Sequence, residues 1–226
     1  MVRFLSDTLL GRLVGSCANG LTIGVLLLTA LAPIKASAIL ISVDDLGGFG
    51  ADSLTRDTNQ GLDFLDLTFS LGRTFNDVSV EFGVGGDFEG FRYATVDEVI
   101  TLANNFGVNP PFTPGDFGDP GIDIGELVDL LGATDPGGPF NRSSTGITSS
   151  SIMAGSRRLV EFIDEFDNVS FTDRISSEPN FSTRVDFTFE ETGSFLVRQA
   201  ETSSVPVPST LVLILAGLVI AARSRL

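Results

Sequence analysis

The sequence has no histidine, no tryptophan and only one cysteine, Cys17. Without an imidazole the chain has no histidine base, no histidine metal ligand and no Ser-His or Cys-His pair. Basic residues are also few, because 14 Lys and Arg stand against 29 Asp and Glu, a formal net charge of −15. A nucleic-acid partner needs a basic surface to neutralise its phosphates, so this charge argues against nucleic acid. What the chain does contain is 25 glycines, 19 phenylalanines and an apolar run near each end.

Residues 1–38 have the three parts of a secretory signal peptide. Arg3 and Arg12 make a basic start, residues 21–32 are apolar, and Ala36 and Ala38 supply the small residues that signal peptidase accepts. As a helix the apolar run is about 18 Å long, against about 30 Å for the hydrocarbon core of a bilayer. This length suits a cleaved signal better than a stable span. We predict cleavage by signal peptidase after Ala38, with an uncleaved N-terminal anchor as the alternative.

Cleavage at this point changes the composition of the mature chain. It removes Cys17 and the only lysine, Lys35, so the exported protein has no thiol, no disulfide and no cysteine nucleophile. The body over residues 39–204 retains 9 arginines against 28 acidic residues. Such a surface repels anionic polymers and attracts divalent cations.

The C-terminal segment, residues 205–226, combines a proline box, an apolar run and a basic end. Two prolines can open a helix, because its first N–H groups have no intrahelical partners. A helix over residues 205–222 is about 27 Å long, just enough to cross a thin bilayer. The terminal arginines favour the cytoplasmic side, which predicts an anchor in the lipid of the inner membrane. The residues concerned are Val205, Pro206, Val207, Pro208 and Ser209 in the box, and Arg223 and Arg225 at the end.

This tail resembles the PEP-CTERM sorting signal of Gram-negative envelope proteins. The resemblance implies recognition by an exosortase, a membrane-embedded cysteine peptidase or transpeptidase that removes the tail, and an association with exopolysaccharide or biofilm. Val207 stands where the family usually carries Glu. If the enzyme recognises that carboxylate, removal of the tail is slow or absent and a plain single-pass anchor remains. A glycolipid-anchor signal fits less well because arginines close the chain, and the Leu-Pro-x-Thr-Gly box of sortase substrates is absent.

Between the two ends, residues 39–200 predict an α+β domain: a mixed or antiparallel sheet with two or three short helices on one face, joined to the tail by a linker over residues 201–204. Capping signals favour helices over residues 95–107 and 123–132, started by Thr95 with Glu98 and by Asp123 with Glu126. A third, shorter helix is expected around residues 76–82. Strands are predicted over residues 62–69, 184–190 and 194–198, and the last two are expected to form a hairpin. A loop is predicted over residues 109–121 and a flexible stretch over residues 135–151. Residues 159–166 fit a helix and a strand equally well.

A weaker resemblance lies within the body. Residues 57–68 (DTNQGLDFLDLT), 90–95 (GFRYAT) and 193–198 (GSFLVR) are similar to stretches that recur in PEP-CTERM proteins. Parts of them also resemble a bacterial surface domain related to C-type-lectin-like folds, which usually has Trp where Phe64 and Phe91 stand here. Independently of any family, Asn59 to Gly61 predict a turn, and Phe91 and Tyr93 are expected to pack against the sheet.

Two groups of oxygen-bearing side chains are candidate sites for a hard cation such as Ca²⁺. Neither has EF-hand spacing, and solvated turn carboxylates and helix caps are the favoured interpretation of both, so no cofactor is predicted beyond this calcium candidate. No motif combines a nucleophile with a base, so we expect a non-enzymatic envelope or matrix protein. The alternatives are a module that binds Ca²⁺ or carbohydrate and a secreted glycosidase with two opposed carboxyl groups. The groups are Asp57, Asn59, Asp63 and Asp66, and Asp116, Asp119 and Asp123.

Overall fold

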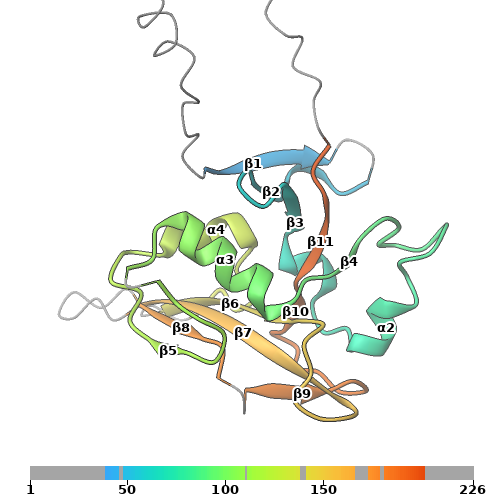
Figure 1. The fold of residues 1–226 in the computed structure, drawn as a ribbon. Helices are drawn as coiled ribbons and strands as arrows, with labels where there is room; N and C mark the ends of the chain where they lie inside the picture. Colours follow the sequence, from blue (N-terminus) through green and yellow to red (C-terminus); the bar gives the residue numbers. More distant parts are fainter. Residues whose placement is uncertain are drawn as a thin grey trace, which may run out of the picture. The chain divides into compact units, whose positions relative to one another are not determined.

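The computed structural model describes residues 39–45, 48–109, 111–137, 141–165, 173–178 and 181–201, all of which belong to one compact unit (Figure 1). The predicted signal peptide, linker residues 202–204 and the predicted sorting tail lie outside these residues. Within the described ranges, none of the helices has the length and apolar character needed to cross a membrane.

The predicted α+β class is confirmed, but the fold has two sheets where one was expected. The first has the order β1-β2-β3-β11-β4 and is antiparallel; the second has the order β10-β6-β7-β8-β5, with β9 added on β7. The elements are β1 (Leu40–Asp45), β2 (Gly50–Asp57), β3 (Leu62–Leu65), the 3-10 helix η1 (Leu67–Ser70), α2 (Phe75–Ser79), β4 (Arg92–Tyr93), α3 (Val96–Phe106), β5 (Phe117–Gly118), α4 (Gly125–Leu131), β6 (Asn141–Ile147), β7 (Ser156–Glu165), β8 (Arg174–Ser176), β9 (Ser182–Arg184), β10 (Gly193–Ser194) and β11 (Leu196–Gln199).

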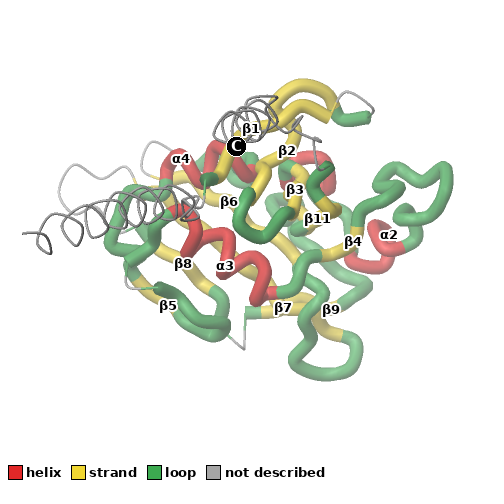
Figure 2. Tube along the Cα trace, turned by 45° about the horizontal axis from the view of Figure 1, so that its top comes forward, coloured by secondary structure: helices red, strands yellow, loops and turns green. Residues whose placement is uncertain are grey.

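Two apolar cores lie on opposite faces of the first sheet. In β3, Leu62 and Phe64 belong to the core that includes α3, α4 and the inner face of β7. Leu65, on the opposite face of the same strand, belongs to a second core with Val78 of α2 and Tyr93 of β4. In both ribbon views α3 and α4 lie against the strands β6, β7 and β8, and α2 stands apart beyond β4 (Figures 1 and 2). Because both of its faces are covered, the central strand β3 is buried at all four positions and lacks the solvent face of a half-exposed strand, whereas the edge strand β1 remains largely exposed.

The helix started by Thr95 is confirmed. The Thr95 hydroxyl accepts a hydrogen bond from the N–H of Glu98, and the Glu98 carboxylate accepts from the N–H of Thr95. The helix ends at Gly107, whose φ of 120° is a conformation that favours glycine. The third predicted helix also exists, but it runs over Phe75–Ser79 and begins one residue earlier than expected, because Thr74 and Asp77 form a capping box.

The expected start of the second helix is wrong. Asp123 and Glu126 form no capping box, and α4 begins at Gly125. The Asp123 Oδ1 accepts a hydrogen bond from the N–H of Gly125 at 2.8 Å, while the N–H of Ile124 donates to Asp173 Oδ2 at 2.8 Å. A residue from a distant strand therefore satisfies a donor that a local side chain was expected to satisfy.

Several strand predictions need correction. Of the ambiguous stretch over 159–166, the described residues 159–165 belong to the strand β7. The expected strand over 62–69 stops at Leu65 and gives way to η1, and the predicted loop over 109–121 includes the two-residue strand β5. The hairpin of 184–190 with 194–198 does not form: β9 ends at Arg184, and β11 pairs with β3 and β4. Phe187 and Phe189 are consequently 51% and 57% exposed.

The stretch over 135–151 was predicted to be flexible, yet it contains the seven-residue strand β6. Its buried positions include Ser144 and Thr145, and the hydroxyl of Ser144 binds the end of α4. The Ser144 Oγ donates to the carbonyls of Val128 and Gly132, at 3.3 and 2.9 Å. The strand shows no hydrophobic pattern because hydrogen bonds to a helix replace the apolar contacts of an ordinary core strand.

Candidate functional site

All nine arginines of the body lie in the described part of the chain, and each has a partner there. Seven form ion pairs with carboxylates. Of the other two, Arg157 lies over the ring of Phe75 and donates to the carbonyl of Ser156, and Arg158 donates to the carbonyl of Ser177. The acidic residues far outnumber these cations, so the described surface offers no basic patch for a polyanion.

The first predicted calcium group does not converge on one point. Asp57, which is fully buried, accepts hydrogen bonds from the N–H groups of Asn59 and Gln60 and so holds the predicted turn. Asp63 forms a two-point ion pair with Arg56, directly opposite on β2, at 2.6 and 2.8 Å. Asp66 caps η1 by accepting from the N–H of Thr68. These carboxylates stabilise three different local structures. The turn and cap roles of Asp57 and Asp66 agree with the interpretation favoured from the sequence, but Asp57 and Asp63 are buried and not solvated.

The second predicted group is also dispersed. Asp116 accepts from the N–H and hydroxyl of Thr113, and Asp119 accepts from the N–H of Gly121. Asp123 instead joins two carboxylates that the sequence did not single out, Asp164 and Asp173. One predicted ligand is therefore placed in a cluster, with different companions.

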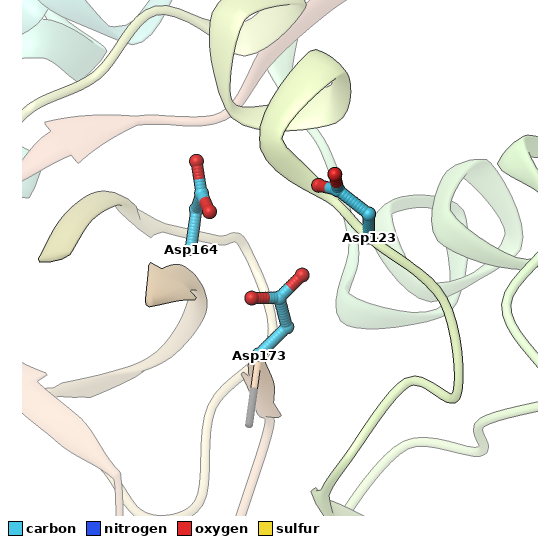
Figure 3. Close-up of side chains that lie close together, drawn as sticks. All are labelled: Asp123, Asp164 and Asp173. Carbon is cyan, nitrogen blue, oxygen red and sulfur yellow. The ribbon is translucent and has the colours of Figure 1, made fainter. Parts of the chain in front are cut away.

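Figure 3 shows Asp123, Asp164 and Asp173 turned toward one another from three elements. Asp123 lies in the loop before α4, Asp164 near the end of β7, and Asp173 just before β8. One carboxylate oxygen of each lies within 4.8 Å of the others. Asp164 and Asp173 are 5% and 4% exposed, whereas Asp123 is exposed. A small cavity of about 230 Å³ adjoins the group.

Hydrogen-bond donors already surround the cluster. The Nε of Arg142 donates to Asp164 Oδ2 at 2.7 Å, and its Nη2 donates to the carbonyl of Gly125 at 3.0 Å. Both oxygens of Asp173 accept backbone hydrogen bonds, from Ile124 and from Glu165. Gly125 leaves room for these side chains, because a Cβ there would lie 2.8 Å from Asp164 Oδ2 and 3.1 Å from Arg142 Nη2 and would displace them.

The close approach of the three carboxylates affects the pKa of Asp173. Burial raises the pKa of its carboxyl above the ordinary range, and the neighbouring charges of Asp164 and Asp123 raise it further, against the lowering effect of the two backbone hydrogen bonds. Three carboxylate oxygens this close are the ligands that a hard cation prefers. In this structure the positive charge beside the carboxylates comes from the guanidinium of Arg142. The cluster therefore serves to hold β6, β7 and α4 together through hydrogen bonds and ion pairs.

A larger groove lies against the first sheet. It has a volume of about 780 Å³ and is bordered by the β1–β2 hairpin, residues 86–91 and the end of β11. Its lining combines the rings of Phe49 and Phe91 with five carboxylates and two guanidinium groups. The charged residues are Asp44, Asp45, Asp87, Glu89, Glu201, Arg56 and Arg198.

Sequence reasoning missed both the groove and the complete cluster. Positions 123, 164 and 173 come together only through the pairing of β7 with β8 and the docking of α4, which no local spacing indicates. The one signal in the sequence was the aspartate just before an amphipathic helix. The predicted targeting residues, Ala36, Ala38, Val205–Ser209, Arg223 and Arg225, lie outside the described residues.

Comparison with models of protein families, with curated proteins and with solved structures gave no match.

Proposed function

We propose that this chain is a non-enzymatic protein of the cell envelope or extracellular matrix, exported through its N-terminal signal and sorted by its PEP-CTERM-like tail. The observation that carries the proposal is the tail itself, in which a proline box, an apolar run and two arginines follow one another in the order of a sorting signal. A signal peptide at the other end is what such a tail requires, because the body must be outside before the tail spans the membrane.

The arrangement of the body supports this proposal. The first strand starts at Leu40, two residues after the expected cleavage point, and the last strand ends at Gln199, just before the linker. In the sequence, the described helices and strands therefore all lie between the two targeting segments. All described arginines are committed to internal partners, which leaves an acidic surface suited to solubility outside the cell.

A catalytic role has less support. The body has no histidine and no cysteine, and the Asp123–Asp164–Asp173 cluster holds its carboxylates against hydrogen-bond donors. A glycosidase needs two carboxyl groups facing each other across a substrate cleft, about 5–10 Å apart. The alternative of a calcium-dependent module has one feature in its favour, this same cluster, and a calcium titration separates it from the main proposal.

The test is the intact mass of the full-length product purified from cells with and without the exosortase. With the enzyme, the mature chain is expected to begin at Ile39 and to lack the apolar run; without it, the run remains. An unchanged C-terminus in both would reduce the sorting proposal to simple anchorage, and a cytosolic product that retains Met1 would contradict export as well.

Val207 provides a sharper variant. If the exosortase recognises the carboxylate that its family places here, Val207→Glu increases the fraction of processed chains. Val205→Glu is the matched control, since it adds the same charge two residues away in the same box. Equal processing of both variants would show that general acidity, and not this position, matters.

A further inference from the structure

The groove between the β1–β2 hairpin, residues 86–91 and the end of β11 has the size and lining of a binding site. Its volume of about 780 Å³ falls in the range of about 300–1,000 Å³ typical of small-ligand sites. We propose that it binds a polysaccharide whose sugars carry free amino groups. This inference rests on the proposed function, because it names the matrix component that the exported domain would hold.

An aromatic group forms one side of the groove. The ring of Phe49 contacts Phe69 and Phe91, with centroids 4.9 and 5.9 Å apart, and stacks nearly parallel to Phe88 at 6.0 Å. Of these rings, Phe49 and Phe91 line the groove, and Phe49 is only partly buried, so its ring remains in reach of a ligand. The face of such a ring is weakly negative, and it attracts both the C–H face of a hexose and a cation.

Beside this aromatic surface lies a polar pair that suits hydroxyl groups. The Nη2 of Arg198 lies 3.3 Å from Asp45 Oδ1, and the guanidinium of Arg198 lies over the ring of Phe91 at 4.9 Å. A sugar hydroxyl donates one hydrogen bond and accepts others, so it can use the carboxylate and the guanidinium at once. An apolar ligand would desolvate this ion pair without supplying any hydrogen bond in return.

The remaining charges select the kind of sugar. Asp44, Glu89 and Glu201 line the groove and are exposed, whereas Arg56 is held by the buried carboxylate of Asp63. This excess of carboxylates repels uronic acids and sulfated sugars, and it favours an ammonium group by charge-assisted hydrogen bonds. A lysine-rich peptide would also satisfy the carboxylates, but its ammonium groups cannot accept a hydrogen bond from the guanidinium of Arg198. The hydroxyls of an amino sugar can accept from Arg198 while its ammonium binds the carboxylates.

The test is calorimetric titration of the full-length protein with an oligosaccharide of glucosamine. The protein is kept in a detergent without a sugar headgroup, at mildly acidic pH and about 0.15 M salt, where long-range attraction is screened within about 8 Å. The same oligosaccharide with acetylated amines, a uronic-acid oligosaccharide and oligolysine are the comparison ligands. We expect the glucosamine form to bind at least about tenfold more tightly than the acetylated form, since a charged hydrogen bond exceeds the 1.4 kcal/mol that tenfold represents.

Matched variants separate the groove from the general acidity of the protein. Phe49→Leu removes an aromatic face in the groove, and Phe189→Leu makes the same change at a ring that does not line it and is 57% exposed. Glu89→Gln with Glu201→Gln removes two groove charges, and Glu190→Gln with Glu191→Gln removes two exposed charges elsewhere. The groove variants are expected to weaken binding at least about tenfold, with the controls unchanged and thermal unfolding checking that every variant is folded.

Absence of binding, equal loss in the control variants, or equal affinity for the acetylated form would overturn the proposal. Tighter binding of oligolysine that depends on the same groove residues would assign the groove to a basic peptide and also overturn it. These outcomes are independent of sorting, because binding is measured on purified protein whether or not the tail is removed. A chain that binds the amino sugar but keeps its tail in cells would contradict only the sorting proposal.

Discussion

The Nε of Arg142 donates a 2.7 Å hydrogen bond to Oδ2 of Asp164, a carboxylate that is 5% exposed. The two residues lie opposite each other on β6 and β7, and the same guanidinium also binds Asp129 and the carbonyl of Gly125 in α4. One side chain therefore joins two strands and a helix, and it compensates a charge that would otherwise be buried alone. Removing either member of such a pair costs more than the pair contributes, because the remaining charge stays desolvated.

The first prediction concerns the ion pair of Arg142 with Asp164. Arg142→Gln is expected to lower the free energy of unfolding by about 3 kcal/mol, since it leaves the carboxylate of Asp164 without its cation. Urea denaturation of the full-length protein measures the change. Arg184→Gln is the control, because Arg184 and Asp186 form a pair that is 75% and 54% exposed, and such surface pairs contribute below about 1 kcal/mol. Similar losses in both variants would mean that Arg142 acts only as a surface cation.

The second prediction concerns calcium. We expect Ca²⁺ to leave the melting temperature of the wild-type protein unchanged, because Asp173 already accepts hydrogen bonds on both oxygens and Arg142 repels a second cation from Asp164. A site filled at 100 times its dissociation constant would stabilise the fold by about 2.7 kcal/mol. Scanning calorimetry with Ca²⁺ and with a chelator measures the difference. A rise that the chelator reverses would contradict this prediction and favour the calcium-dependent module.

The third prediction is a pH dependence that originates at Asp173. Its raised pKa means that the folded state binds the proton more tightly than the unfolded state. As pH falls from neutrality through the raised pKa toward the ordinary value of about 3.9, protonation of Asp173 therefore adds stability. Asp173→Asn cannot take up this proton. The difference in unfolding free energy should shift in favour of the wild type across this window, as measured by urea denaturation at a series of pH values.

Comparison with the variant isolates this effect. Other carboxyls work in the opposite direction: the hydrogen bond from Arg92 lowers the pKa of Glu98, whose stabilising contribution is lost as pH falls. That contribution is the same in both proteins and cancels in the difference. A difference that stays constant with pH would show that the proton on Asp173 is held no more tightly in the folded chain than in the unfolded one.

The predictable parts of the fold are those in which neighbours in sequence satisfy one another. Thr95 and Glu98 are three residues apart, and their reciprocal hydrogen bonds need nothing from the rest of the chain. The same holds for Asp57 and the turn over Asn59 to Gly61, which the sequence indicated by its residue types. In each case the residues that give the signal also make the contact.

The unpredictable parts depend on partners far along the chain. The strand β6 lies in a stretch predicted to be flexible; it carries Ser and Thr in place of an apolar pattern, and Ser144 binds carbonyls at the end of α4. Phe187 and Phe189 alternate as in a half-buried strand, yet they pair with each other in a T-shaped contact at 5.2 Å and remain exposed. Local alternation cannot say whether a sheet is available to receive it, and here β11 pairs with β3 and β4 instead.

The fourth prediction tests the contact of β10 and β6 with η1. Gly193 of β10 lies opposite Gly146 of β6, and both face Leu67. A Cβ on Gly193 would lie 2.4 Å from the carbonyl oxygen of Leu67 and 2.8 Å from its Cβ, so backbone would have to move. Gly193→Ala should therefore lower the free energy of unfolding by about 3 kcal/mol, the upper end of the usual cost of overpacking.

Gly83→Ala is the matched control for this variant. Gly83 is exposed, and a methyl group added to it would meet no atom within 4 Å. Such surface changes stay within about 0.5 kcal/mol. Equal stability of the two variants in urea denaturation would mean that η1 does not pack closely against β10 in solution.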